Sequence, residues 1–121
     1  MLESKIYGHL STSAAVVAAV GTRIYPVRAP QDVTAPYIVY SRISGGQISG
    51  LSGYQTMENP RIQIDVFTTS YSTAKGIADS IHSLMETASG YKSILISDMD
   101  LFEEDFSFYR VSMDFSVFNR E

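Results

Sequence analysis

One stretch of the sequence has a glycine spacing that could bind phosphate: residues 44–53, which read SGGQISGLSG. A nucleotide-binding P-loop needs G-x-x-x-x-G-K-[ST], in which backbone amides and the lysine bind the phosphates. Gly45 and Gly50 have the required separation, but Leu51 stands where the lysine should be. The stretch is also expected to lead into a strand, whereas a P-loop leads into a helix, and no G-x-G-x-x-G pattern is present. Nucleotide binding is therefore not expected.

The two histidines, His9 and His82, are the next candidates, because imidazole transfers protons and binds metals near neutral pH. They are expected on two different helices. Neither has a neighbouring Asp or Glu pattern that would complete a metal-binding triad. We therefore assign no catalytic or metal-binding role to either histidine.

An acidic run, Asp98–Asp105, contains five carboxylates in eight residues. A calcium-binding EF-hand loop needs glycine at its sixth position and glutamate at its twelfth. Counted from Asp98, these positions hold Glu103 and Tyr109, so the EF-hand interpretation fails. The run is interpreted as the solvated end of a hairpin, with Glu103 to Asp105 in the turn. A contact with a basic partner is the alternative.

The sequence lacks the other common signatures of catalysis. It contains no cysteine, which excludes disulfides, thiolate zinc ligands and cysteine nucleophiles. It contains no G-x-S-x-G motif, the turn that presents a nucleophilic serine in hydrolases. We predict that the protein is not an enzyme, needs no metal or cofactor, and has no catalytic, cofactor-binding or metal-binding residues.

Composition and charge limit the partners. The chain has 121 residues, 45% of them hydrophobic, which suits one domain with a real core. The net charge is −4, and the six arginines and three lysines are scattered, so no specific nucleic-acid binding is expected. The nearest approach to a signal-peptide core is Ala14–Val20, far shorter than a membrane span. A soluble intracellular protein without a membrane partner is expected.

Hydrophobic periodicity predicts the elements that must position any functional residues. A helical region ends at Gly21 and forms either two short helices or one bent helix. The clearest strand signal is Arg61–Phe67, where apolar and polar residues alternate. The predicted order is helix 2–20, short strand 23–26, strand 36–43, strand 61–67, helix 71–88 with a C-cap at Gly90, strand 93–97 with an unclear continuation to 102, and strand 108–118. This order predicts an α+β fold of two layers, a mainly antiparallel sheet with helices packed on one face.

Three phenylalanines, Phe106, Phe108 and Phe118, fall out of phase with the odd-numbered apolar face of the last strand. A β-bulge would explain them. A second apolar face that another subunit covers is the alternative, because aromatic side chains are enriched in interface cores.

The connection between the strands at 36–43 and 61–67 runs from about Ser44 to Asn59, some sixteen residues. Hairpin connections are usually two to five residues, and longer ones tend to be functional or disordered. This loop is expected to be flexible. It is either a tip with no role or an arm that becomes ordered against a partner. The candidate partner-contact residues are Gly46, Ile48, Leu51, Tyr54 and Met57.

The sequence resembles a known family through several pieces in a fixed order. Residues 19–26 read AVGTRIYP, 29–31 read APQ, 35–40 read APYIVY and 61–67 read RIQIDVF, followed by Tyr71 and the helix from Ala74 to Leu84. This pattern covers roughly residues 15 to 85. It is similar to the tail completion, or tail terminator, proteins of long-tailed bacteriophages.

The resemblance implies a structural role in virion assembly. Such a protein caps the tail tube, ends its polymerisation and forms the head–tail joining surface, commonly as a hexameric ring. The implied partners are the tail tube protein, the head–tail connector proteins and further copies of the chain. The implied locations are the head–tail interface of the virion tail and, during assembly, the host cytoplasm. The whole chain, 1–121, would be one tail terminator-like domain with a flexible loop at 44–59.

Two other functions remain open from the sequence. A different neck protein, such as a head-completion adaptor or stopper, would share the ring but bind on the portal side. A small intracellular enzyme or ligand-binding domain would show a well-formed apolar pocket with convergent polar groups. The ring interpretation requires two opposed, non-identical contact surfaces.

Overall fold

The computed structural model describes residues 2–44, 47–49, 56–105 and 107–120. The element order agrees with the sequence prediction, with two short strands added between the second and third predicted strands. The described elements are α1 (Leu2–Thr12), α2 (Ala14–Val20), β1 (Ile24–Pro26), β2 (Tyr37–Ser44), β3 (Gln47–Ser49), β4 (Thr56–Glu58), β5 (Arg61–Thr68), α3 (Tyr71–Glu86), β6 (Lys92–Glu103) and β7 (Phe108–Arg120).

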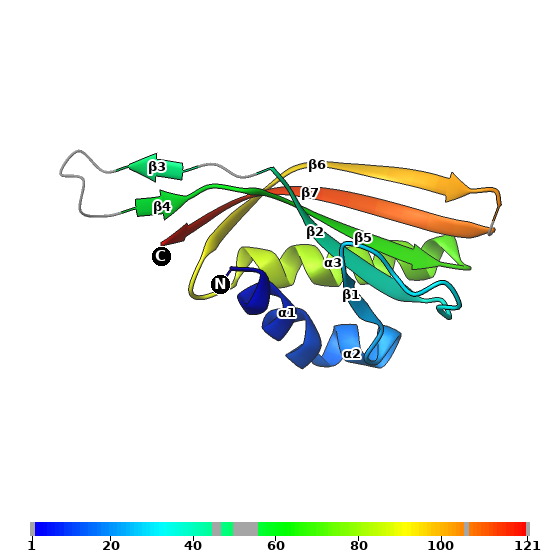
Figure 1. The fold of residues 1–121 in the computed structure, drawn as a ribbon. Coiled ribbons are helices and arrows are strands. Elements are labelled where there is room, and N and C mark those ends of the chain that lie inside the picture. The colour runs from blue at the N-terminus through cyan, green and yellow to red at the C-terminus, as the bar shows by residue number, and fades with distance from the viewer. Residues whose placement is uncertain (1, 45–46, 50–55, 106, 121) are drawn as a thin grey trace.

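The sheet is organised around β7, which has neighbours on both sides. On one side, β7 pairs with β5 and then, at Asn119 and Arg120, with β4. On the other side it pairs with β6. The strand order is β1-β2-β5-β7-β6, with β4 and β3 extending the sheet at the end of β7, and only the β1–β2 pair is parallel. Figure 1 shows all three helices on one face of this sheet. The predicted two-layer α+β fold is therefore confirmed.

The core lies between the helices and one face of the sheet. Alternation along β5 and β7 buries every second side chain, as the period of two in Arg61–Phe67 predicted. The apolar stripe of α3 covers this face. The central buried residues are Ile62, Ile64 and Val66 of β5, Val111, Met113, Phe115 and Val117 of β7, and Ala74, Ile77, Ala78, Ile81 and Met85 of α3.

The N-terminal region forms two helices, which resolves the alternative of one bent helix. Ser13 separates them, and its hydroxyl accepts a hydrogen bond from the Val16 amide at 3.4 Å, as an N-cap does. Gly21 ends α2 with a φ of 61° and donates its amide to Val17 O at 2.8 Å. The predicted stop at Gly21 is confirmed, and its positive φ explains the residue type.

A pair of glycine substitutions separates backbone strain from helix propensity. We expect Gly21→Ala to lower the free energy of unfolding by about 1–2 kcal/mol, because alanine is strained at positive φ. Gly8 lies inside α1, and an added Cβ would meet no atom within 4 Å. Gly8→Ala should therefore raise the free energy of unfolding by about 0.5–1 kcal/mol. Urea unfolding of both variants checks the pair, and equal shifts would contradict it.

The structure corrects four details of the sequence prediction. The connection 44–59 contains the strands β3 and β4, so it is not a plain loop. The C-cap of α3 is Thr87, and Gly90 (φ 96°) lies in the following turn. β6 runs through Glu103, so the acidic run lies mostly in a strand and only Glu104 and Asp105 form the turn. The β5–β7 register is continuous, so no bulge in the described part of β7 explains Phe108 or Phe118, and Phe106 lies outside the described residues.

Candidate interaction surfaces

The β3–β4 hairpin forms an arm that projects beyond the helices (Figure 1). Its strands pair antiparallel, with Ile48 opposite Met57, and β4 joins the arm to the end of β7. Two of the five predicted contact residues, Ile48 and Met57, therefore become backbone neighbours. Their side chains, like Gly46, Leu51 and Tyr54 as a whole, lie outside the described part of the chain. Their contact role stays a prediction.

A buried polar network fixes the base of the arm. Glu58, at the end of β4, accepts a hydrogen bond from Asn119 Nδ2 at 2.7 Å and forms an ion pair with Arg42 at 3.0 Å. Lys5 of α1 donates to Asn119 Oδ1 at 2.8 Å. Glu58 and Asn119 are both buried. Four elements, α1, β2, β4 and β7, are therefore held together where the arm leaves the body.

The outer strand β6 is the second candidate surface. It is twelve residues long, and within the described chain only β7 pairs with it, so one backbone edge is open. Half of the exposed large apolar residues in the described chain lie on this strand: Ile94, Ile96, Met99, Leu101 and Phe102. Natural proteins usually protect such an edge with charges, prolines or a covering element. β6 carries charged residues at Lys92, Asp98, Asp100 and Glu103, but its exposed apolar side chains make it a candidate interaction surface.

A bulge in β6 places Ile94, Met99 and Leu101 together on the helix-free face of this edge. The register with β7 shifts between Leu95 and Ser97. Before the shift, Ser93 bonds to Met85 of α3, which places odd-numbered residues on the helix side. After it, Asp100 contacts α3, so even-numbered residues lie on that side. Phe102, opposite Tyr109 and in contact with its ring, lies on the helix side.

Polar contacts hold the far half of β6 against α3. Asp100 accepts a hydrogen bond from the Tyr71 hydroxyl at 2.6 Å and forms an ion pair with Lys75 at 3.2 Å. The Tyr71 hydrogen bond, and secondarily Lys75, lower the pKa of the Asp100 carboxyl. Asp98, two residues earlier, is exposed and forms no ion pair with any described residue. Asp98 lies opposite Met113, on the helix side of the strand with Asp100 and within electrostatic reach of Lys75, whereas Met99 and Leu101 lie on the other face.

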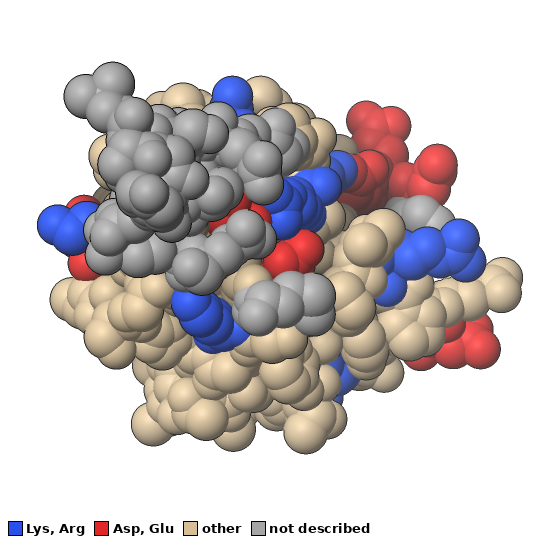
Figure 2. Space-filling view, turned by 60° about the vertical axis from the view of Figure 1, so that its left-hand side comes forward, with Lys and Arg blue, Asp and Glu red and all other residues tan. Residues whose placement is uncertain are grey.

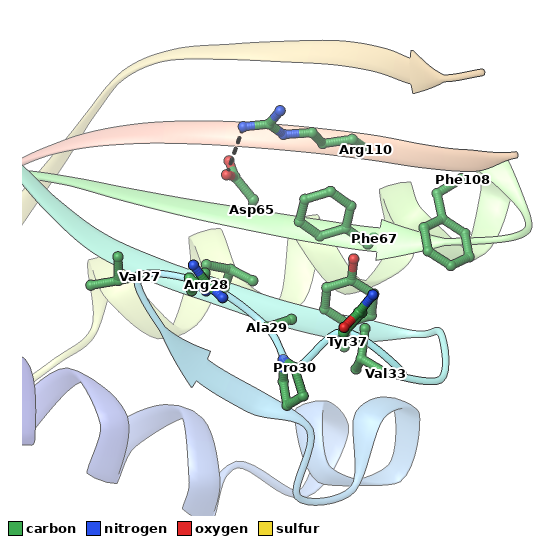
Figure 3. Close-up of a pocket in the computed structure, with 12 residues that line it drawn as sticks. Val27, Arg28, Ala29, Pro30, Val33, Tyr37, Asp65, Phe67, Phe108 and Arg110 are labelled. Atoms are coloured by element: carbon green, nitrogen blue, oxygen red, sulfur yellow. Dashed lines mark hydrogen bonds and ion pairs between the residues drawn. The ribbon is translucent and has the colours of Figure 1, made fainter. Parts of the chain in front are cut away.

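A cleft of about 500 Å³ lies on the helix-free face of the sheet, under the loop that follows β1 (Figure 3). Three aromatic rings line it, from β2, β5 and β7. Tyr37 stacks on Phe67 with ring centroids 4.7 Å apart, and Phe108 meets Tyr37 edge-on at 5.9 Å. Phe108, one of the out-of-phase phenylalanines, therefore belongs to a second apolar cluster on this face. A second apolar face is therefore present, and its coverage by another subunit stays a prediction.

An ion-pair cluster closes the polar side of the cleft. Arg110 donates to Asp65 at 2.9 Å and to Glu103 at 3.1 Å, and its guanidinium lies 5.4 Å from the Phe67 ring centroid. Burial alone would lower the pKa of Arg110, but the two carboxylates outweigh it and the net shift is upward. Burial also raises the pKa of the Tyr37 hydroxyl. The Arg110 guanidinium and the Tyr37 hydroxyl thereby keep their protons at neutral pH, which suits a structural role better than proton transfer.

The edge of the sheet opposite β6 differs in character. Val27, directly after β1, is 73% exposed and has a φ of 68°, a strained conformation for a β-branched residue. Arg28 beside it is exposed and forms no ion pair with any described residue. On β2, Ile43 is also exposed. This edge thus carries apolar side chains and an available positive charge.

The two histidines contact residues that belong neither to the two edge surfaces nor to the cleft. His9 Nδ1 lies 2.9 Å from the Tyr91 hydroxyl, and His82 lies 3.3 Å from Glu86 one turn along α3.

No group of three or more acidic or histidine side chains in the described chain is arranged to hold a metal ion. None of the described helices is long and apolar enough to cross a membrane. Charged side chains of both signs are interspersed on the face in Figure 2.

The buried hydroxyl of Tyr91 makes stability depend on alkaline pH. Burial raises the pKa of Tyr91 to about 12, from 10.0 in the unfolded chain. Between these values the unfolded state loses the proton while the folded state keeps it, so stability falls as pH rises. Wild type should lose about 1–2 kcal/mol more than Tyr91→Phe between pH 9 and 12, less than the full shift implies because the folded hydroxyl is itself half deprotonated at pH 12. Parallel pH profiles in urea unfolding would contradict this.

Comparison with known proteins adds what the geometry alone does not contain. The family model described as "Tail completion protein gp17" matches residues 4–119. The fold is similar to that of a chain in the solved "Virion of native gene transfer agent (GTA) particle", with a TM-score of 0.78, 19% identity, and coverage of 99% of this chain and 95% of that one. A search of curated proteins finds no match. The chain thus belongs to the tail completion protein gp17 family and is a structural protein of the phage tail.

Proposed function

We propose that this protein caps the tail tube of a bacteriophage, ends tube polymerisation and forms the surface to which the head connector binds, as a ring that is a hexamer on assembly. Its partners are the tail tube protein, the head–tail connector proteins and copies of itself, and residues 1–121 act as one domain. It resides at the head–tail interface of the virion and passes through the host cytoplasm during assembly. It is not an enzyme.

Family membership over nearly the whole chain carries this proposal. The structure supports it through two open, unlike surfaces at opposite edges of the sheet, one acidic and apolar along β6, the other apolar and basic at Val27 and Arg28. Contacts between unlike surfaces of identical subunits form a ring when the rotation from one subunit to the next closes on itself. The arm between Ser44 and Asn59 is then the part that reaches a neighbouring subunit or the tube, through Gly46, Ile48, Leu51, Tyr54 and Met57.

The enzyme or ligand-binding alternative rests on the aromatic cleft. The cleft offers apolar walls and the Asp65–Arg110 pair, but within the described residues it brings together no nucleophile with an adjacent base. The neck-protein alternative differs in its partner, because an adaptor or stopper would bind the portal side. It predicts that the protein leaves the growth of the tube unchanged.

Tube growth tests the proposal directly. Purified tail tube protein is polymerised with increasing amounts of this protein, and tube lengths are measured by negative-stain electron microscopy. We expect shorter tubes as the ratio of this protein to tube protein rises. Tyr54→Ala in the arm should weaken the effect, whereas Val17→Ala, a change at a 40% exposed site on α2, should not. Tube lengths independent of the added protein would overturn the proposal.

A further inference from the structure

Two groups of exposed side chains lie at opposite edges of the sheet and are not part of the core. The β6 surface consists of Ile94, Ile96, Met99, Leu101 and Phe102 together with Asp98. The β1-side surface consists of Val27, Arg28 and Ile43. The strand order β1-β2-β5-β7-β6 separates them by the width of the sheet.

Backbone groups are open on both edges. β6 lacks a described neighbour on its outer side over its full length. On the other edge, β1 ends at Pro26, opposite Tyr40, so β2 from Ser41 to Ser44 has no described strand on that side. Pro26 itself has no N–H, which leaves side chains to make the contact at that point.

Charge distinguishes a head-to-tail contact from a symmetric one. Between two β6 edges, the exposed Asp98 of each copy would add negative charge to both sides of the contact, and like charges oppose symmetric pairing. The turn after β6 adds the exposed Glu104 and Asp105. Against the β1-side surface, the same carboxylates would instead face Arg28 and the nearby Arg23. Opposite charges on matching surfaces favour the correct partner and its orientation.

Strain at Val27 points in the same direction. The Val27 amide donates to Tyr40 O at 2.8 Å, which holds the residue at positive φ and directs it away from the core. Its side chain is the most exposed large apolar one in the described chain. Strained residues of this kind occur preferentially at functional sites.

We propose that the β6 surface of one copy binds the β1-side surface of the next, and that this heterologous contact forms the ring. The inference rests on the proposed function for the closure of the ring, but the contact itself involves only copies of this chain. Met99 and Leu101, on the helix-free face of β6, then lie against Val27 and Ile43 of the neighbour, and the exposed Glu104 and Asp105 of the turn after β6 lie near Arg28. The helices and the arm remain outside this contact.

Cysteine cross-linking tests the contact, because the chain has no cysteine of its own. Met99→Cys and Val27→Cys each place one thiol on an exposed site of a different surface. Under mild oxidation, we expect a covalent dimer only when the two variants are mixed. The double variant, Val27→Cys with Met99→Cys, should give a ladder of oligomers. Val17→Cys on α2 is the control for random collision, and thermal unfolding checks that each variant is folded.

Each outcome of the cross-linking experiment supports or overturns the proposed interface. Dimers from Met99→Cys alone would overturn the proposal in favour of symmetric pairing of β6. Failure of the mixture to exceed the Val17→Cys control at any concentration would also overturn it. The assay contains no tube protein, so a negative cross-linking result with normal shortening of tubes would reject the interface and leave the proposed function standing. A cross-linked ladder without any effect on tube length would support the interface and reject the proposed function.

Discussion

Replacing Ile64 by alanine should lower the free energy of unfolding by about 2–5 kcal/mol, the range expected when a fully buried aliphatic side chain is truncated. Ile64 is completely buried at the centre of β5, between β2 and β7 and beneath α3. Removing its side chain loses the transfer free energy and leaves a cavity that two hydrogen-bonded neighbouring strands cannot collapse to fill. Urea denaturation followed by circular dichroism measures the change.

Ile94→Ala is the matched control for this prediction. Ile94 is also a strand isoleucine, but it is 60% exposed on β6. Its loss should change the free energy of unfolding by less than about 0.5 kcal/mol. If Ile94→Ala destabilised the monomer as much as Ile64→Ala, β6 would be part of the core and its assignment as an open surface would be wrong.

Replacing Glu58 by alanine should cost about 2–4 kcal/mol, because it removes the acceptor shared by Asn119 and Arg42. Asn119 is buried and would lose its Nδ2 partner, and Arg42 would keep only Glu3 at 3.8 Å. Since this network ties β4 to β7, the arm should also lose protection. Hydrogen exchange of residues 56–58 measures that local effect, and chemical denaturation measures the global one.

Two variants separate the causes of the Glu58 effect. Glu58→Gln keeps an acceptor for Asn119 but removes the charge, so it should lie between wild type and Glu58→Ala. Glu104→Ala removes an exposed carboxylate from the β6–β7 turn and should be nearly neutral. Unchanged stability in Glu58→Ala would mean that the network contributes nothing to holding the arm.

Elements with one uninterrupted period could be predicted from the sequence. β5 and α3 each bury one face and expose the other. The alternation of Arg61–Phe67 and the apolar stripe of α3 follow from this, and local spacing is sufficient to identify both. The order of the sequence motifs also identified the family. The α+β architecture followed, because strands that neighbour each other in sequence tend to pair.

The surfaces could not be predicted in the same way, because they depend on long-range pairing. The bulge in β6 changes which face its side chains occupy, so no single alternation runs through residues 92–103. The Glu58–Asn119 bond joins residues 61 apart, and the Lys5–Asn119 bond joins residues 114 apart. The aromatic cluster of Tyr37, Phe67 and Phe108 likewise assembles from three strands. The out-of-phase position of Phe108 was a signal of this second apolar face.

Electron microscopy of tube ends tests the central claim most directly. Tubes of the purified tail tube protein are incubated with this protein, and the tube ends are aligned and averaged. The account predicts one additional ring of density at one end of each tube, and no further growth of that end when tube protein is added. Tubes whose ends are unchanged and continue to grow, although this protein is present and folded, would contradict the account.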